Sequence, residues 1–174
     1  MYKRQYYHLF GQKSHPPGID LAEKLLSVAP DTVSKVFFNN SGSEANDTAI
    51  KIIWYYNNAR GRHQKKKIIG RINGYHGITL ASSSLTGRSL NHAGFDVPLE
   101  KFIHTNNPHY YRFGENGETE EDFATRMAND LDQLITDEGP ETVAAFFAEP
   151  VMGAGGVIIP PDTYFSKIQD DQVS

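Results

Sequence analysis

Continuous apolar runs mark the candidate strands of this chain. Val36–Phe38 is interpreted as the end of a buried strand, Lys67–Ile72 as a second and Val143–Ala148 as a third, with a shorter strand over Lys101–Thr105. Runs that do not alternate between apolar and polar positions are typical of parallel strands whose two faces are both covered. The pattern therefore predicts a mostly parallel sheet.

Apolar positions spaced three and four residues apart predict helices between these strands. Two long helices are expected over Ala45–Arg60 and Glu121–Ile135, and shorter ones over Asp20–Ala29, Thr79–Leu85 and Pro161–Gln169. Strands that alternate with helices along the chain indicate the α/β class.

The amino-acid composition argues against several classes of protein function. The 174 residues are 39% hydrophobic and 22% charged, with a net charge of −4, which is ordinary for a globular domain and gives no reason to expect nucleic acid as a partner. No apolar stretch reaches the roughly 20 residues that span a bilayer. Without cysteine there is no disulfide framework, thiol catalysis or Cys-type zinc site, and the histidines lack metal-ligand spacing. We expect a cytoplasmic protein with no metal.

Candidate chemistry gathers where the predicted strands end. After the first of them, the turn Ser41–Ser43 opens a helix. Backbone N–H groups at a helix start lack partners and favour negative charge, and Gly42 and Ser43 would let a phosphate come close to them. Ser41 and Glu44 equally make a capping box, which any helix can use. From this stretch alone, both interpretations stay open.

The other two long strands end in an aromatic ring and a carboxylate. Lys67–Ile72 leads into Tyr75 and His76, and Val143–Ala148 leads into Glu149. Ligands of open parallel sheets bind outside the carboxyl ends of the strands, so these groups form suitable walls for a phosphorylated heterocycle. The alternatives are a core aromatic for Tyr75, a hydrogen-bonded loop residue for His76 and a simple strand terminator for Glu149.

Three longer motifs carry a family resemblance. They are Phe37–Asp47, Ile69–Gly77 and Ala144–Pro161, in the family's order and spacing. The chain resembles the large domain of the class III pyridoxal-phosphate-dependent aminotransferases, in particular the omega-amino acid:pyruvate transaminase branch, over about residues 6 to 169. The resemblance implies part of the mostly parallel-sheet large domain of a fold-type I enzyme, truncated at both ends.

The resemblance also implies a role for each candidate residue. Gly42 and Ser43 would bind the phosphate of pyridoxal 5′-phosphate, Tyr75 would stack on its ring, and Glu149 would lie beside the cofactor. The family's lysine, which bonds covalently to the cofactor, and the aspartate that pairs with the pyridine nitrogen are expected downstream. No catalytic residue is therefore expected in this chain, and the chain alone is expected to be inactive.

The implied reaction moves an amino group from an amine or omega-amino acid to a keto acid such as pyruvate, in a homodimer. An aminomutase or a decarboxylating relative on the same scaffold, and a non-catalytic phosphate-binding module, remain alternatives. The predicted divisions are a helix-bearing N-terminal segment over residues 1–30 with non-native first residues, a partial cofactor-binding domain over residues 31–169, and a truncated tail over residues 170–174.

Overall fold

The computed structural model of the protein describes residues 13–171. The chain divides into two compact units between Asn39 and Asn40. The first unit carries α1 (Pro16–Leu26), where the His15 ring accepts the Gly18 N–H at 3.0 Å and caps the helix. Proline fits the first turn of a helix because its missing N–H needs no partner there. The helix therefore begins and ends earlier than predicted.

The predicted strand over Val36–Phe38 is wrong. These residues form no strand, and the side chains of Phe37 and Phe38 are 72% and 49% exposed. An apolar run becomes a strand only where a neighbouring strand completes its backbone hydrogen bonds. Within residues 13–171, no strand pairs with this run.

The second unit is built on a parallel three-stranded sheet in the order β2-β1-β3. The strands are β1 (Lys67–Arg71), β2 (Phe102–Thr105) and β3 (Val143–Phe146). Central β1 pairs Ile69 with Ile103 on one side and with Phe146 on the other. All three strands lie in predicted apolar runs, so these predictions are confirmed. Because the strands are parallel, their carboxyl ends lie at the same edge of the sheet.

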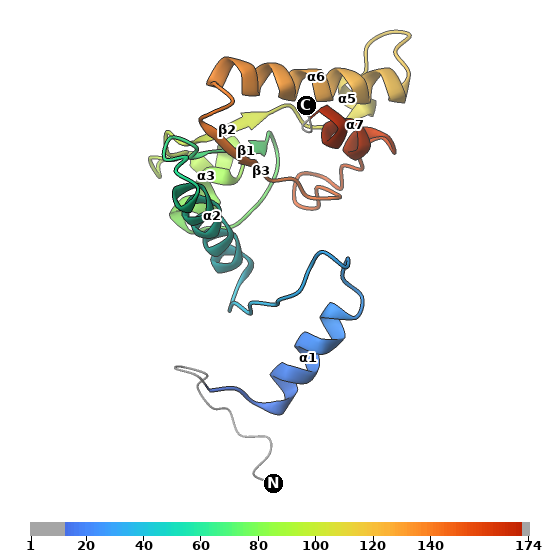
Figure 1. The fold of residues 1–174 in the computed structure, drawn as a ribbon. Coiled ribbons are helices and arrows are strands. Elements are labelled where there is room, and N and C mark those ends of the chain that lie inside the picture. Colours follow the sequence, from blue (N-terminus) through green and yellow to red (C-terminus); the bar gives the residue numbers. More distant parts are fainter. Residues whose placement is uncertain (1–12, 172–174) are drawn as a thin grey trace. The chain divides into compact units, whose positions relative to one another are not determined.

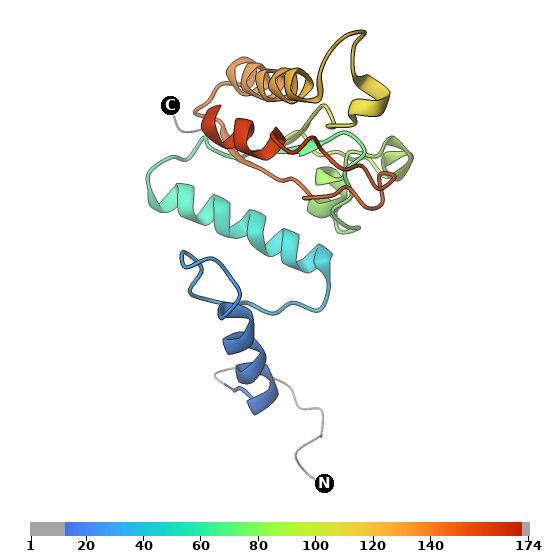
Figure 2. The ribbon, with the colours of Figure 1, turned by 90° about the vertical axis from the view of Figure 1, so that its right-hand side faces the viewer.

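Helices cover both faces of this sheet (Figures 1 and 2). The helices of the second unit are α2 (Gly42–Ala59), α3 (Leu80–Leu85), α4 (Ser89–His92), α5 (Tyr110–Phe113), α6 (Glu120–Glu138) and α7 (Tyr164–Asp171). Helices α6 and α7 pack with Ile69 in one apolar core, and α2 and α3 pack with Ile68 in another. Successive strand residues point to opposite faces, so β1 contributes to both cores. The predicted α/β class is confirmed.

The boundary between the units places residues 31–39 with the first unit. The predicted non-native first residues, and residues 172–174 of the predicted tail, lie outside the described residues. No helix within residues 13–171 is long and apolar enough to cross a membrane.

Candidate functional site

The N-terminus of α2 is capped by its own sequence. Ser41 Oγ accepts the N–H of Glu44 at 3.2 Å, and the Glu44 carboxylate accepts the N–H of Asn40 at 2.9 Å. The expected capping interactions are therefore present, although the carboxylate reaches the residue before the cap. The Glu44 carboxylate is thus hydrogen-bonded to the backbone that precedes the helix. This orientation reduces its repulsion of an anion beside Gly42.

The first turn of α2 leaves hydrogen-bond donors open. The N–H groups of Gly42 and Ser43 have no acceptor within residues 13–171, and nothing lies within 4 Å of the place where a Cβ of Gly42 would be. Ser43 Oγ accepts the N–H of Ile78 at 3.1 Å, which leaves the hydroxyl proton for another acceptor. Two N–H groups, a hydroxyl and the positive end of the helix dipole together suit an anion.

Side chains of α2 and of the start of α3 hold this turn in place. Asp47 Oδ1 lies 2.8 Å from both Thr79 Oγ1 and Ser82 Oγ, and accepts the Ser82 N–H at 3.2 Å. The fully buried Ser82 hydroxyl is also 2.9 Å from the carbonyl oxygen of Ser43. Sequence analysis missed these residues because the contacts join distant positions. The run of hydroxyl residues over Ser82–Ser84 was the only signal available.

The loop after β1 packs against this turn. A side chain at Gly77 would collide with Ser43, and the φ of +136° at Gly77 also favours glycine. The N–H of His76 donates to Thr86 Oγ1 at 2.9 Å, and its carbonyl accepts the Asn46 amide at 2.6 Å. Burial lowers the pKa of the His76 imidazole below its ordinary value. These contacts agree with the interpretation of His76 as a hydrogen-bonded loop residue.

Glu149 joins the loop after β1 to the loop after β3. Its Oε1 accepts the Tyr75 N–H at 3.0 Å, and its Oε2 accepts the Gly153 N–H at 3.3 Å. The two loops also touch by their backbones, because a Cβ on Gly155 would lie only 2.6 Å from the carbonyl oxygen of Asn73. Glu149 is therefore more than a strand terminator. Tyr75 as a residue is 37% exposed, so it is not enclosed in the core.

One loop thus connects the residues that the sequence singled out. Tyr75 bonds to Glu149 at one end of the loop, and Ile78 bonds to Ser43 at the other. Three residues span at most roughly 11 Å. The loop therefore limits the distance between the first turn of α2 and the pair formed by the Tyr75 ring and the Glu149 carboxylate.

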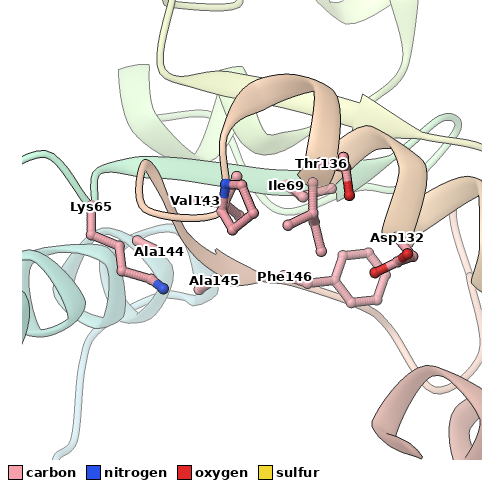
Figure 3. Close-up of a pocket in the computed structure, with 10 residues that line it drawn as sticks. Lys65, Ile69, Asp132, Thr136, Val143, Ala144, Ala145 and Phe146 are labelled. Atoms are coloured by element: carbon pink, nitrogen blue, oxygen red, sulfur yellow. The ribbon is translucent and has the colours of Figure 1, made fainter. Parts of the chain in front are cut away.

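A pocket of about 350 Å³ lies away from this site, between β3 and the second half of α6 (Figure 3). Seven of its ten lining residues are of apolar type, and Lys65 and Asp132 are the charged members. None of the predicted site residues lines it. Among residues 13–171, no cluster of three or more His, Asp and Glu side chains could hold a metal ion.

The chain is similar to known aminotransferases over nearly all of its length. The family model for class III aminotransferases matches residues 3–171. Gamma-aminobutyrate transaminase 1, mitochondrial, of Oryza sativa subsp. indica is 57% identical over 170 residues, which are 97% of this chain and 33% of that protein. Vanillin aminotransferase of Capsicum frutescens is 56% identical over 94% of this chain and 36% of its own length.

Solved structures of transaminases share the fold. The omega transaminase from Pseudomonas jessenii in complex with PMP superposes with a TM-score of 0.93 at 60% identity, over 98% of this chain and 38% of that chain. A PMP-bound aminotransferase from Vibrio fluvialis has a TM-score of 0.88 at 49% identity, over 95% of this chain and 36% of that chain.

These neighbours are fold-type I transaminases, so the predicted fold type is confirmed. The chain spans about a third of the length of the curated relatives that it matches. Pyridoxal phosphate is the cofactor of the matched family, as the resemblance implied. With a family model that covers nearly all of its residues, the chain belongs to the class III aminotransferases.

Proposed function

We propose that the protein carrying this chain is a pyridoxal-phosphate-dependent transaminase that moves an amino group from an amine or omega-amino acid to a keto acid such as pyruvate. The observation that carries the proposal is the loop that bonds Tyr75 to Glu149 and Ile78 to Ser43. The loop joins the first turn of α2 to the Tyr75 ring and the Glu149 carboxylate at one edge of the sheet, and this arrangement supports the proposal. The names of the relatives, which include gamma-aminobutyrate, vanillin and omega transaminases, agree with an amine or an omega-amino acid as donor.

The residues present fit the cofactor. The N–H groups of Gly42 and Ser43 and the Ser43 hydroxyl would bind its phosphate, since these donors are open and the space beside Gly42 is free. Tyr75 would pack on the ring, and Glu149, whose two oxygens each accept a backbone N–H, would present a carboxylate of fixed orientation. When bound, the cofactor withdraws electrons from the substrate bond that breaks. The role of the residues in this chain would be to bind and orient the cofactor.

Proton transfer and covalent attachment would come from outside this chain. In the proposed enzyme a lysine performs both, and an aspartate meets the pyridine nitrogen. Within residues 13–171 lysine ion pairs are formed with Glu138 and Glu121, and neither involves Glu149. The matched relatives extend well beyond the stretch that this chain spans. We therefore propose that residues 31–169 are part of a larger cofactor-binding domain.

A second subunit would complete the site. Ile78, Leu80, Leu90 and Phe95 are each more than two-thirds exposed and line one pocket of about 420 Å³ beside the loop of Tyr75. Contiguous exposed apolar side chains mark interaction surfaces. We propose that this surface meets the partner in a homodimer.

Mitochondrial and chloroplastic relatives exist among plants, and the cytoplasm is the location that we propose for this protein.

The test is turnover with defined substrates. The full-length protein with pyridoxal phosphate, an amine donor and pyruvate is expected to form alanine, and the 174-residue chain alone is expected to form none above free cofactor. Formation of an isomeric amino acid or of carbon dioxide without consumption of pyruvate would instead identify an aminomutase or a decarboxylase. Failure of the full-length protein to bind the cofactor would refute the proposal in favour of a non-catalytic module.

A further inference from the structure

Arg71 is a buried cation at the end of β1. Only 1% of the surface of Arg71 is exposed to solvent. Nη2 donates to the main-chain carbonyl oxygen of Glu149, and the guanidinium lies 5.8 and 6.0 Å from the ring centroids of Tyr164 and Phe165. The charge therefore lies where the end of β1, the loop after β3 and helix α7 meet.

The contacts of Arg71 within residues 13–171 satisfy its guanidinium only in part. Within residues 13–171 Arg71 forms no ion pair, and its Nη1 has no hydrogen-bond partner. A buried charge without a carboxylate partner, and a buried donor without an acceptor, both oppose folding. An apolar side chain of similar volume would avoid both penalties. One group that the guanidinium does hold is a main-chain carbonyl group.

That group is the backbone of Glu149. The Arg71 guanidinium fixes the carbonyl at the same residue whose carboxylate bridges the N–H groups of Tyr75 and Gly153. Both carboxylate bonds require that the main chain at Glu149 keeps its orientation. We propose that Arg71 is a positioning residue, which holds Glu149 so that its carboxylate can fix Tyr75 for the cofactor ring. The consequence for the cofactor rests on the proposed function, whereas the hold on the two loops does not.

Arg126 is a matched control. Its guanidinium pairs with Glu118 at 2.8 Å and also donates to the carbonyl of Phe113 at 2.9 Å. It therefore combines a cation, a carbonyl acceptor and an aromatic contact, as Arg71 does, since it lies 5.1 Å from the Phe123 ring. It has no contact with Glu149. Arg126→Met therefore shows the effect of losing a buried or half-buried arginine, and Arg71→Met shows in addition the effect of losing the contact with Glu149.

The first test measures hydrogen exchange of the Tyr75 and Gly153 amides in the cofactor-free full-length protein. Arg71→Met and Glu149→Ala are each expected to speed exchange of both amides at least tenfold, while Arg126→Met is expected to leave them unchanged. If Arg71 acts through the Glu149 carboxylate, the double variant exchanges no faster than Glu149→Ala alone. Unchanged exchange in Arg71→Met, or a further increase in the double variant, would overturn the proposal.

A second variant, Arg71→Lys, keeps the test possible if Arg71→Met does not fold. Arg71→Lys keeps the charge and one donor, so it is expected to exchange faster than wild type and more slowly than Glu149→Ala. If Arg71→Met shows no cooperative melt, the lysine variant carries the test, and exchange equal to wild type then overturns the proposal.

A third measurement reads the cofactor itself. The Kd for pyridoxal phosphate is expected to rise about tenfold in Arg71→Met, with a shifted absorption band of the bound cofactor, and no further in the double variant with Glu149→Ala. If the wild type binds no cofactor, the proposed function fails and the exchange result still decides the role of Arg71. If the wild type binds cofactor and exchange is unchanged by Arg71→Met, the role of Arg71 alone fails.

Discussion

The two long helices of the second unit begin in the same way and are used differently. Helix α2 has 18 residues and α6 has 19. In both, a hydroxyl caps the N-terminus, with Ser41 Oγ accepting the Glu44 N–H at 3.2 Å and Thr119 Oγ1 accepting the Asp122 N–H at 3.1 Å. A capping motif therefore does not distinguish a helix that only packs from a helix that we propose to bind a ligand.

The difference lies in what surrounds the two helix ends. The first turn of α6 carries Glu120, Glu121 and Asp122, which already offset the positive end of its dipole. The first turn of α2 carries Glu44 alone, turned back to the preceding backbone. Helix α6 also buries five side chains, whereas α2 buries two. Helix α6 is thus arranged for packing, and α2 keeps its N-terminus available.

The largest expected effect tests the packing side of this comparison. Phe123 on α6 is fully buried, and Tyr55 on α2 is 75% exposed. Phe123→Ala is expected to lower the free energy of unfolding of the 174-residue chain by about 3–5 kcal/mol. Tyr55→Ala is expected to change it by less than about 0.5 kcal/mol. Urea titration gives both values, and equal losses would show that the two helices do not differ in this way.

The next effect concerns the open end of α2. A Cβ at Gly42 meets nothing in the protein, so Gly42→Val is expected to fold normally and yet block the approach of the cofactor phosphate. We expect a rise of about 100-fold in Kd, or about 2.7 kcal/mol. The control is Glu120→Val, which places the same side chain at the first helical position of α6. Dialysis and absorbance of the full-length enzyme measure retention, and equal retention in Gly42→Val would remove the phosphate site.

Single contacts in the site should matter less. Ser43→Ala is expected to weaken cofactor binding about tenfold, because a hydrogen bond to a charged group contributes roughly 1.5–3 kcal/mol. Tyr75→Ala is expected to weaken it less, since an aromatic pair contributes about 0.5–1.5 kcal/mol. Thr119→Ala, the corresponding cap change on α6, is expected to lower stability and leave cofactor affinity unchanged. Equal affinity in Ser43→Ala and wild type would reduce the turn to a helix cap.

The smallest effect is a dependence of stability on pH. Burial lowers the pKa values of His76 and His104 below 6.5. The unfolded chain therefore binds more protons than the folded one as the pH falls below 6.5, so stability is expected to decrease there and to be fully present above it. Urea midpoints at pH 7.5 and 5.5 check the direction. His104→Gln is expected to reduce the slope, and a slope of opposite sign would contradict the assignment.

Local sequence patterns correctly predicted strands and helices that pack against other elements described in this chain. The runs that became β1 and β3, and the helix that became α6, were located to within a few residues, because burial on one or both faces imprints its period on the sequence. The run Val36–Phe38 has the same apolar character but no described strand beside it, and it formed none. Strand formation depends on a partner that a local pattern does not reveal.

The site was predictable only as far as its motifs reach. The positions of Tyr75 and Glu149 followed from the strands that precede them, whereas Gly42 and Ser43 were located by the turn that opens a helix, because the strand predicted before that turn does not form. The roles of all four stay predictions. The contact of Asp47 with Ser82 joins residues 35 apart, and that of Arg71 with Glu149 joins residues 78 apart. No periodicity records such pairs. In sequence, Arg71 is indistinguishable from an ordinary residue at the end of a strand.

The most direct test of the difference between α2 and α6 is an NMR titration of the 15N-labelled chain with pyridoxamine phosphate, which carries the phosphate and does not react with lysine. The account predicts that the amide resonances of Gly42 and Ser43 shift, that those of Glu120 and Glu121 at the start of α6 do not, and that pyridoxamine without phosphate shifts neither pair. Resonances of Gly42 and Ser43 that stay in place, or that shift no more than those of α6, would contradict it.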